Sequence, residues 1–116
     1  MGYRSEVYLG VDKRVTGELL TFATINPECY TLLFQHSEYA KKTKKGGLHF
    51  GWEYIKWYDD FVNVSKLMNW VEENITSVRF LRIGENSDDV QEMGHSDEYH
   101  YQVTRKVEVQ VFDNED

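Results

Sequence analysis

Residues 48–58, LHFGWEYIKWY, are the most aromatic part of the chain and decide its fold class. Large rings suit the pleated, half-buried surface of a β-strand. Strand alternation places Phe50, Trp52 and Tyr54 on one face of this segment. The KKGG that precedes it supplies a tight turn, because paired glycines accept the positive φ angles that such turns need. We therefore expect residues 37–58 to form a β-hairpin.

The N-terminal quarter of the chain predicts a strand followed by helices. Residues 3–11 alternate with one face more apolar, which is typical of a strand tied into a sheet. Residues 12–25 repeat apolar side chains at spacings of three and four, which indicates a helix. A second short helix over 27–36 follows, with Asn26 as its cap and Pro27 at its first position. A strand is the competing prediction for that segment, because it is rich in strand-forming residues.

The C-terminal half predicts one helix and a second hairpin. Apolar residues at alternating spacings of three and four, following the capping pair Asp59-Asp60, indicate a helix that runs to Asn74. Residues 77–84 are predicted to form a short strand. In residues 99–112 the two faces alternate residue by residue, which predicts a long antiparallel strand with one solvent-exposed face. We expect these two strands to pair across the acidic segment 85–98.

The order of elements predicts an α+β fold. It is a two-layer sandwich in which two or three helices cover one face of a mostly antiparallel sheet. A length of 116 residues is that of one domain. We expect residues 1–112 to form this domain and the acidic residues 113–116 to be a frayed tail.

Charge and composition exclude several classes of protein. The net charge of −7 argues against free nucleic acid as a direct partner, because phosphate binding needs a basic face. No apolar stretch approaches the length of a membrane-spanning helix, so we expect no membrane partner. Cys29 is the only cysteine, which excludes an intrachain disulfide and fits a reducing compartment. These features predict a cytoplasmic protein.

Residues 85–98 are the main candidate for a working surface, because they contain acids and no lysine or arginine. The acids are Glu85, Asp88, Asp89, Glu92, Asp97 and Glu98. A solvated hairpin loop is the plainer interpretation, and a surface that steers a basic partner protein is the functional one. Metal binding by acids of this segment together with His95 is a weaker alternative, since the spacing matches neither a calcium loop nor a zinc site. We therefore predict no metal site.

Three arginines inside strand patterns form a second candidate site: Arg4, Arg82 and Arg105. A buried arginine must be paired, so a structural ion pair is the plainer interpretation. The alternative is a site that binds a phosphate or carboxylate ligand, because a guanidinium donates two parallel hydrogen bonds to such anions. Glu53 and His49 would complete a polar pocket around it.

Aromatic side chains are the third candidate. Trp52 and Tyr58 are predicted to contact a partner, with Tyr58 the more exposed, although core packing is the plainer interpretation for this group. Cys29 is expected to be a buried thiol, because no histidine is spaced to activate it. The sequence contains no phosphate-cradling glycine loop, serine elbow or HExxH motif. We therefore predict no catalytic residue and no cofactor.

Three short motifs resemble a family of small phage and prophage proteins. They are MGYRSEV at 1–7, IKWY at 55–58, and RIGE at 82–85 with two aspartates at 88–89. The family has no settled activity, so the resemblance implies no catalytic residue. It implies an accessory phage protein made in the bacterial cytoplasm. Residues 26–46 lie outside the resemblance.

Together these observations predict a non-catalytic accessory protein that modulates or inhibits a host protein through an acidic surface. The partner would have a basic surface, such as that of a defence or transcription factor whose nucleic-acid groove the acids occupy. The tail 113–116 and the aromatics of 52–58 would add contacts. The alternative function is a small ligand-binding protein or enzyme that uses the strand arginines.

Overall fold

The computed structural model describes residues 2–86, 88–105 and 108–113, with side chains described as far as Tyr99. The elements, in chain order, are β1 (Ser5–Val11), η1 (Lys13–Val15), α1 (Thr16–Ile25), α2 (Pro27–Phe34), β2 (Tyr39–Lys42), β3 (Leu48–Ile55), α3 (Val62–Glu73), η2 (Ile75–Ser77), β4 (Val78–Ile83), β5 (Val90–Met93), β6 (Tyr99–Arg105) and β7 (Glu108–Asp113). None of the described helices is long and apolar enough to cross a membrane.

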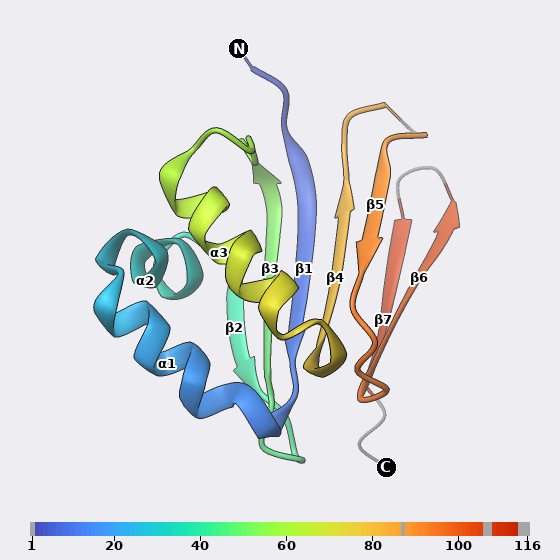
Figure 1. Ribbon diagram of the computed structural model, residues 1–116. Helices are drawn as coiled ribbons and strands as arrows, with labels where there is room; N and C mark the ends of the chain where they lie inside the picture. Colours follow the sequence, from blue (N-terminus) through green and yellow to red (C-terminus); the bar gives the residue numbers. More distant parts are fainter. Residues whose placement is uncertain (1, 87, 106–107, 114–116) are drawn as a thin grey trace.

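The architecture is the α+β fold that the sequence predicts. Five strands form an antiparallel sheet in the order β2-β3-β1-β4-β5, and the three α-helices cover one face of it (Figure 1). Strands β6 and β7 pair with each other in a separate sheet. The sheet therefore ends at two edge strands, β2 and β5.

The main core lies between the sheet and the helices. The central strand β1 directs Val7, Leu9 and Val11 toward the helices, and all three are fully buried. Leu67 and Val71 of α3 pack into the same core from the helix side. Burying a side chain of this size contributes about 1.5–3 kcal/mol, so the alternation of β1 and the apolar stripe of α3 fix how the two layers face each other.

The junction of the first two helices differs from the prediction in its capping. Residues 27–34 are helical, so the competing strand prediction is wrong. Asn26 occupies the predicted N-cap position of α2, but its side chain makes no capping hydrogen bond there; its amide donates to the Phe22 carbonyl oxygen at 2.9 Å and so satisfies the end of α1. Likewise α3 begins after Phe61 without a side-chain cap, and the predicted caps at 59–60 are exposed.

The predicted hairpin of β2 and β3 is confirmed, with Gly46 adopting a φ of +92° in its turn. One irregularity changes the faces of β3. Ser5 lies opposite Ile55 but Val7 lies opposite Trp52, so β3 contains one extra residue, a β-bulge. Because the bulge breaks the alternation, Tyr54 is 69% exposed and does not share the buried face of Trp52.

The second hairpin differs from the prediction. Strand β4 pairs with β5, which lies inside the acidic segment, and not with residues 99–112. Cross-strand pairs explain this choice, because Arg79 contacts Glu92 and Arg82 contacts Gln91 between the two strands. Residues 99–112 instead fold back as β6 and β7.

Tyr99 attaches the start of β6 to the sheet face opposite the helices. Its hydroxyl donates to the carbonyl oxygens of Val11 and Leu48, at 3.1 and 2.9 Å. The ring lies over Gly10 so closely that a Cβ there would be 2.5 Å from it, which requires glycine at this position. Of the predicted solvent-exposed face of 99–112, the side chains after Tyr99 lie outside those described. Of the predicted frayed tail 113–116, Asp113 is the last residue of β7, and residues 114–116 lie outside the described part of the chain.

Candidate functional site

The acids of residues 85–98 do not form one continuous surface, because strand β5 runs through the middle of the segment. Three acids precede β5 in the turn after β4, one lies on β5, and two follow it; in chain order they are Glu85, Asp88, Asp89, Glu92, Asp97 and Glu98. Asp89 and Glu98 are half-buried and the other four are exposed. The prediction of a single acidic loop is therefore wrong, and the exposed acids divide between the two ends of β5.

Asp89 belongs to a structural cluster. Arg82, 16% exposed in its side chain, donates from Nη2 and Nη1 to the two carboxylate oxygens of Asp89 at 2.8 and 3.2 Å. It also donates to Gln91 and to the Ser5 hydroxyl, both at 3.2 Å. The Tyr3 hydroxyl donates to Asp89 at 2.7 Å. The hydrogen bonds from Arg82 and Tyr3 hold the pKa of Asp89 below its usual range.

We expect replacement of Arg82 by methionine to lower the free energy of unfolding by about 2 kcal/mol, because it removes charge-assisted hydrogen bonds from a half-buried site. A double-mutant cycle with Asp89→Asn, followed by urea denaturation, measures the coupling. The matched cycle is Arg79→Met with Glu92→Gln, a more exposed pair at 3.3 Å, whose coupling should be well under about 1 kcal/mol. Equal couplings would contradict the structural role of Arg82.

Arg4 and Arg82, the two described members of the predicted arginine site, do not form a shared anion site. The Arg4 backbone N–H donates to Glu85 at 2.7 Å, and the Arg4 guanidinium lies 5.1 Å from the centre of the Tyr54 ring. All three guanidinium nitrogens of Arg82 already donate to described partners. The Arg105 side chain lies outside the described side chains. Arg4 and Arg82 therefore have separate structural partners.

His49 lies away from Arg4 and Arg82 and is half-buried beside the rings of Tyr39 and Tyr99. It pairs with Gly10 near the far end of β1 from Arg4. Its ring centre is 5.2 Å from that of Tyr39 and 5.7 Å from that of Tyr99. Burial, assisted by the charge of Lys41, lowers the pKa of His49 to about 4. The ring is thus neutral at pH 7, and neither of the two arginines whose side chains are described, Arg4 and Arg82, forms a pocket with it.

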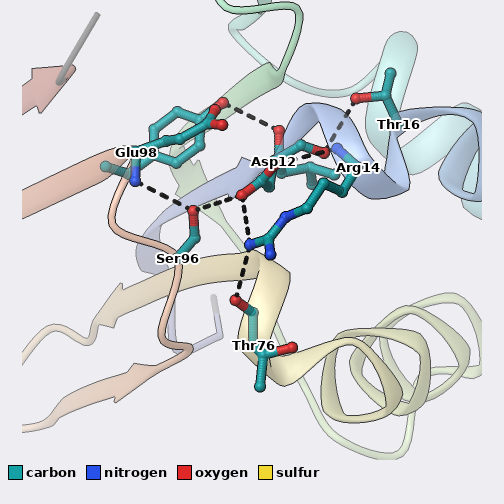
Figure 2. A network of polar contacts seen from close by, with 8 residues as sticks. Asp12, Arg14, Thr16, Thr76, Ser96 and Glu98 are labelled. Atoms are coloured by element: carbon teal, nitrogen blue, oxygen red, sulfur yellow. Dashed lines mark hydrogen bonds and ion pairs between the residues drawn. The ribbon is translucent and has the colours of Figure 1, made fainter.

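A buried polar network holds the other end of the acidic segment (Figure 2). Its centre is Asp12, which is 3% exposed. The Asp12 carboxylate accepts from the backbone N–H and Nη2 of Arg14 at 3.0 and 2.8 Å, and from the Ser96 hydroxyl at 3.5 Å. Arg14 also donates to the Thr76 carbonyl oxygen at 3.5 Å, and the Glu98 N–H donates to Ser96 at 3.3 Å. The network thereby ties the chain before β6 to the end of β1.

The pKa values of the two carboxyl groups in this network, Asp12 and Glu98, are shifted in opposite directions. Burial alone would raise the pKa of Asp12, but the side-chain and backbone hydrogen bonds from Arg14 outweigh it and lower the pKa. Burial and the neighbouring Asp12 charge raise the pKa of Glu98. Asp12 caps the 3-10 helix η1 that leads into α1, so its predicted place at the start of a helix is confirmed, while its part in this network was missed. Its side chain accepts from the backbone N–H two residues on, as in an Asx-type turn.

The aromatic candidates are mainly structural. Trp52 is fully buried, and its indole N–H donates to the Leu32 carbonyl oxygen at 3.0 Å, so the prediction that it contacts a partner is wrong. Tyr58 is half-buried, and its hydroxyl accepts from the Tyr3 backbone N–H at 2.8 Å. Cys29 is a buried thiol as predicted, and burial raises its pKa to about 11.

Hollows lined by described residues include two beside the helices. The larger, about 590 Å³, lies along α1 and is lined partly by Phe22 and the exposed Ile25. The smaller, about 240 Å³, lies between α3 and β5. Its lining is Asp59, Val64, Ser65, Met68, Asn69, Glu72 and Gln91. We call this smaller hollow the α3–β5 groove.

Within residues 2–86, 88–105 and 108–113, the structure places no group of three or more His, Cys, Asp or Glu where it could hold a metal ion. Comparison of the chain with models of protein families, with curated proteins and with solved structures finds no match.

Proposed function

We propose that the protein is a non-catalytic binding protein that docks a basic surface of another protein at the β5 edge of its sheet. One observation carries this proposal. Glu85, Asp88 and Glu92 are exposed in and beside β5, which is the last strand of the five-stranded sheet. We call these three residues the acidic edge. Asp89 and Glu98 are left out, because each is half-buried among structural partners. Asp97 is exposed but follows the other end of β5, so it is left out as well. Glu85 and Glu92 stay exposed although Glu85 accepts from the Arg4 backbone N–H and Glu92 contacts Arg79.

The distribution of charge over the sheet supports docking of a basic partner at the β5 edge. The opposite edge strand, β2, exposes Lys41 and Lys42, so the two edges of the sheet carry opposite charges. A partner with a basic surface is attracted to β5 and repelled from β2. Such a field speeds association and makes it sensitive to salt.

The resemblance to small phage proteins suggests where the protein would meet its partner and what kind of protein that partner is. A phage accessory protein meets its target in the host cytoplasm. We propose that the target is a host defence or transcription protein, inhibited because the acidic edge occupies the groove in which it binds nucleic-acid phosphates. This part of the proposal rests on the motifs at 1–7, 55–58 and 82–89.

We expect a tagged protein to capture a basic host protein from bacterial lysate at low salt and to release it at high salt. The triple variant Glu85→Gln, Asp88→Asn, Glu92→Gln should lose this capture. A charge-matched control changes three exposed acids elsewhere, namely Glu18, Glu53 and Glu73, to glutamine. Mass spectrometry of the bound fraction identifies the partner. If both triple variants captured it equally well, the proposal would be contradicted.

A further inference from the structure

Strand β5 has an unoccupied side along its backbone. It ends the five-stranded sheet, and no described strand pairs with its outer side. The β6–β7 pair lies toward the same side of the molecule but forms a sheet of its own (Figure 1). Val90 is 40% exposed and the Glu92 side chain 49% exposed, so the face of β5 that carries them is open to solvent. An edge strand of this kind offers a row of backbone donors and acceptors to an added chain.

The pairing register of β5 shows where the side chains of an added strand would go. Gln91 lies opposite Arg82 and Met93 opposite Phe80, on the helix side of the sheet. Gln91 also lines the α3–β5 groove. Since residues paired side by side share a face, alternate side chains of an added strand would point to the helix side beside Gln91, at the groove.

The groove has the chemistry of a receptor for a basic side chain. Its lining contains the exposed carboxylates of Asp59 and Glu72, the amides of Asn69 and Gln91, and no lysine or arginine. Met68 supplies an apolar wall. Arginine and lysine carry a long apolar stem that packs on such a wall and a cationic head that pairs with carboxylates.

We propose that β5 accepts an extended, arginine- or lysine-bearing segment of a partner protein as an added strand, with one basic side chain in the α3–β5 groove. The inference rests on the proposed function and names the form of the partner. Backbone hydrogen bonds to β5 provide affinity, and the groove selects charge at alternate positions. The other edge strand cannot substitute, because Lys41 and Lys42 of β2 repel a basic segment.

Peptides of defined backbone test this proposal. The probe is the peptide Arg-Thr-Arg-Thr-Arg-Thr-Arg, and its control replaces each threonine with proline, which keeps the charge but removes the N–H groups a strand needs. NMR titration of the full chain follows the backbone amides of 90–93 and the side-chain amides of Asn69 and Gln91. We expect the threonine peptide to shift these signals and to bind at least about tenfold more tightly than the proline peptide.

A pair of variants tests the groove separately. Glu72→Gln should weaken the threonine peptide about fivefold, because it removes one charged partner of the arginine head. Glu73→Gln makes the same charge change at the neighbouring exposed residue outside the groove lining and should leave affinity within about twofold.

The outcomes separate this inference from the proposed function. If the threonine and proline peptides bound with equal affinity, and only the acidic-edge variant lost this binding, strand addition would be contradicted. Electrostatic docking at the acidic edge would still be supported. Absence of shifts at 90–93, or an equal effect of the two glutamine variants, would also overturn the inference. If the acidic-edge variant still captured the partner from lysate, and the threonine peptide still bound along β5, only the proposed function would be contradicted.

Discussion

Replacement of Trp52 by alanine should lower the free energy of unfolding by about 3–5 kcal/mol, the range for removing a large aromatic ring from a core. The ring is fully buried, and its centre lies 5.1 Å from that of Trp57 and 6.1 Å from that of Phe50. The substitution also leaves the Leu32 carbonyl oxygen without the indole N–H. Because small domains are stable by only about 5–15 kcal/mol, a large share of the stability is lost.

Urea denaturation measures this effect against two controls. Trp52→Phe keeps a ring but loses the indole, and should cost about 1–2 kcal/mol. Tyr54→Ala removes an aromatic residue that is exposed beyond the β-bulge, and should change stability by less than about 0.5 kcal/mol. A Trp52→Ala variant that kept its stability would contradict the burial of Trp52 in the core.

Acidification should destabilise the protein by about 3 kcal/mol through His49 alone. The pKa of His49 is lowered from 6.5 to about 4 by burial and by Lys41. In this window the unfolded chain binds a proton that the folded protein does not, so stability falls as pH decreases from 6.5 and levels off below about 4. The contribution of His49 is fully present above pH 6.5.

Replacing His49 with phenylalanine should flatten the dependence of stability on pH across this window, because the remaining rings of this group, Tyr39 and Tyr99, are phenols that titrate only at alkaline pH. The control is His95→Gln, at an exposed histidine, which should leave the slope unchanged. Chemical denaturation at a series of pH values gives both slopes. An unchanged slope in His49→Phe would show that other groups account for the acid sensitivity.

The sequence predicts those elements whose pattern is long and regular. The apolar stripe of α3 and the alternation of β1 extend over enough residues for their periodicity to identify them. The hairpin of β2 and β3 follows from its glycine turn. These segments are sufficient to identify the fold class.

The elements that sequence reasoning missed depend on contacts between distant residues. Strand β5 has only four residues, two of them polar, and forms because Arg79 and Arg82 of β4 meet partners on it. Strand β6 begins at Tyr99, whose ring lies over Gly10, a contact that no local pattern signals. Asp12 becomes the centre of a network only when residues 76–98 return to it.

Three short sequence motifs, at 1–7, 55–58 and 82–89, lie together in the structure. Tyr3 and Ser5 of the first motif contact Asp89 and Arg82 of the third, and the Tyr3 backbone contacts Tyr58 of the second. These contacts stabilise one end of the sheet.

The association rate of the captured partner, measured over a range of ionic strength, tests the acidic edge most directly. For the wild-type protein we expect a rate that falls steeply as salt increases. The triple variant Glu85→Gln, Asp88→Asn, Glu92→Gln should associate at least about tenfold more slowly at low salt, with a flatter salt dependence. The control variant at 18, 53 and 73 should stay closer to wild type. If the two triple variants shared the same rate and slope, the partner would not dock at the β5 edge.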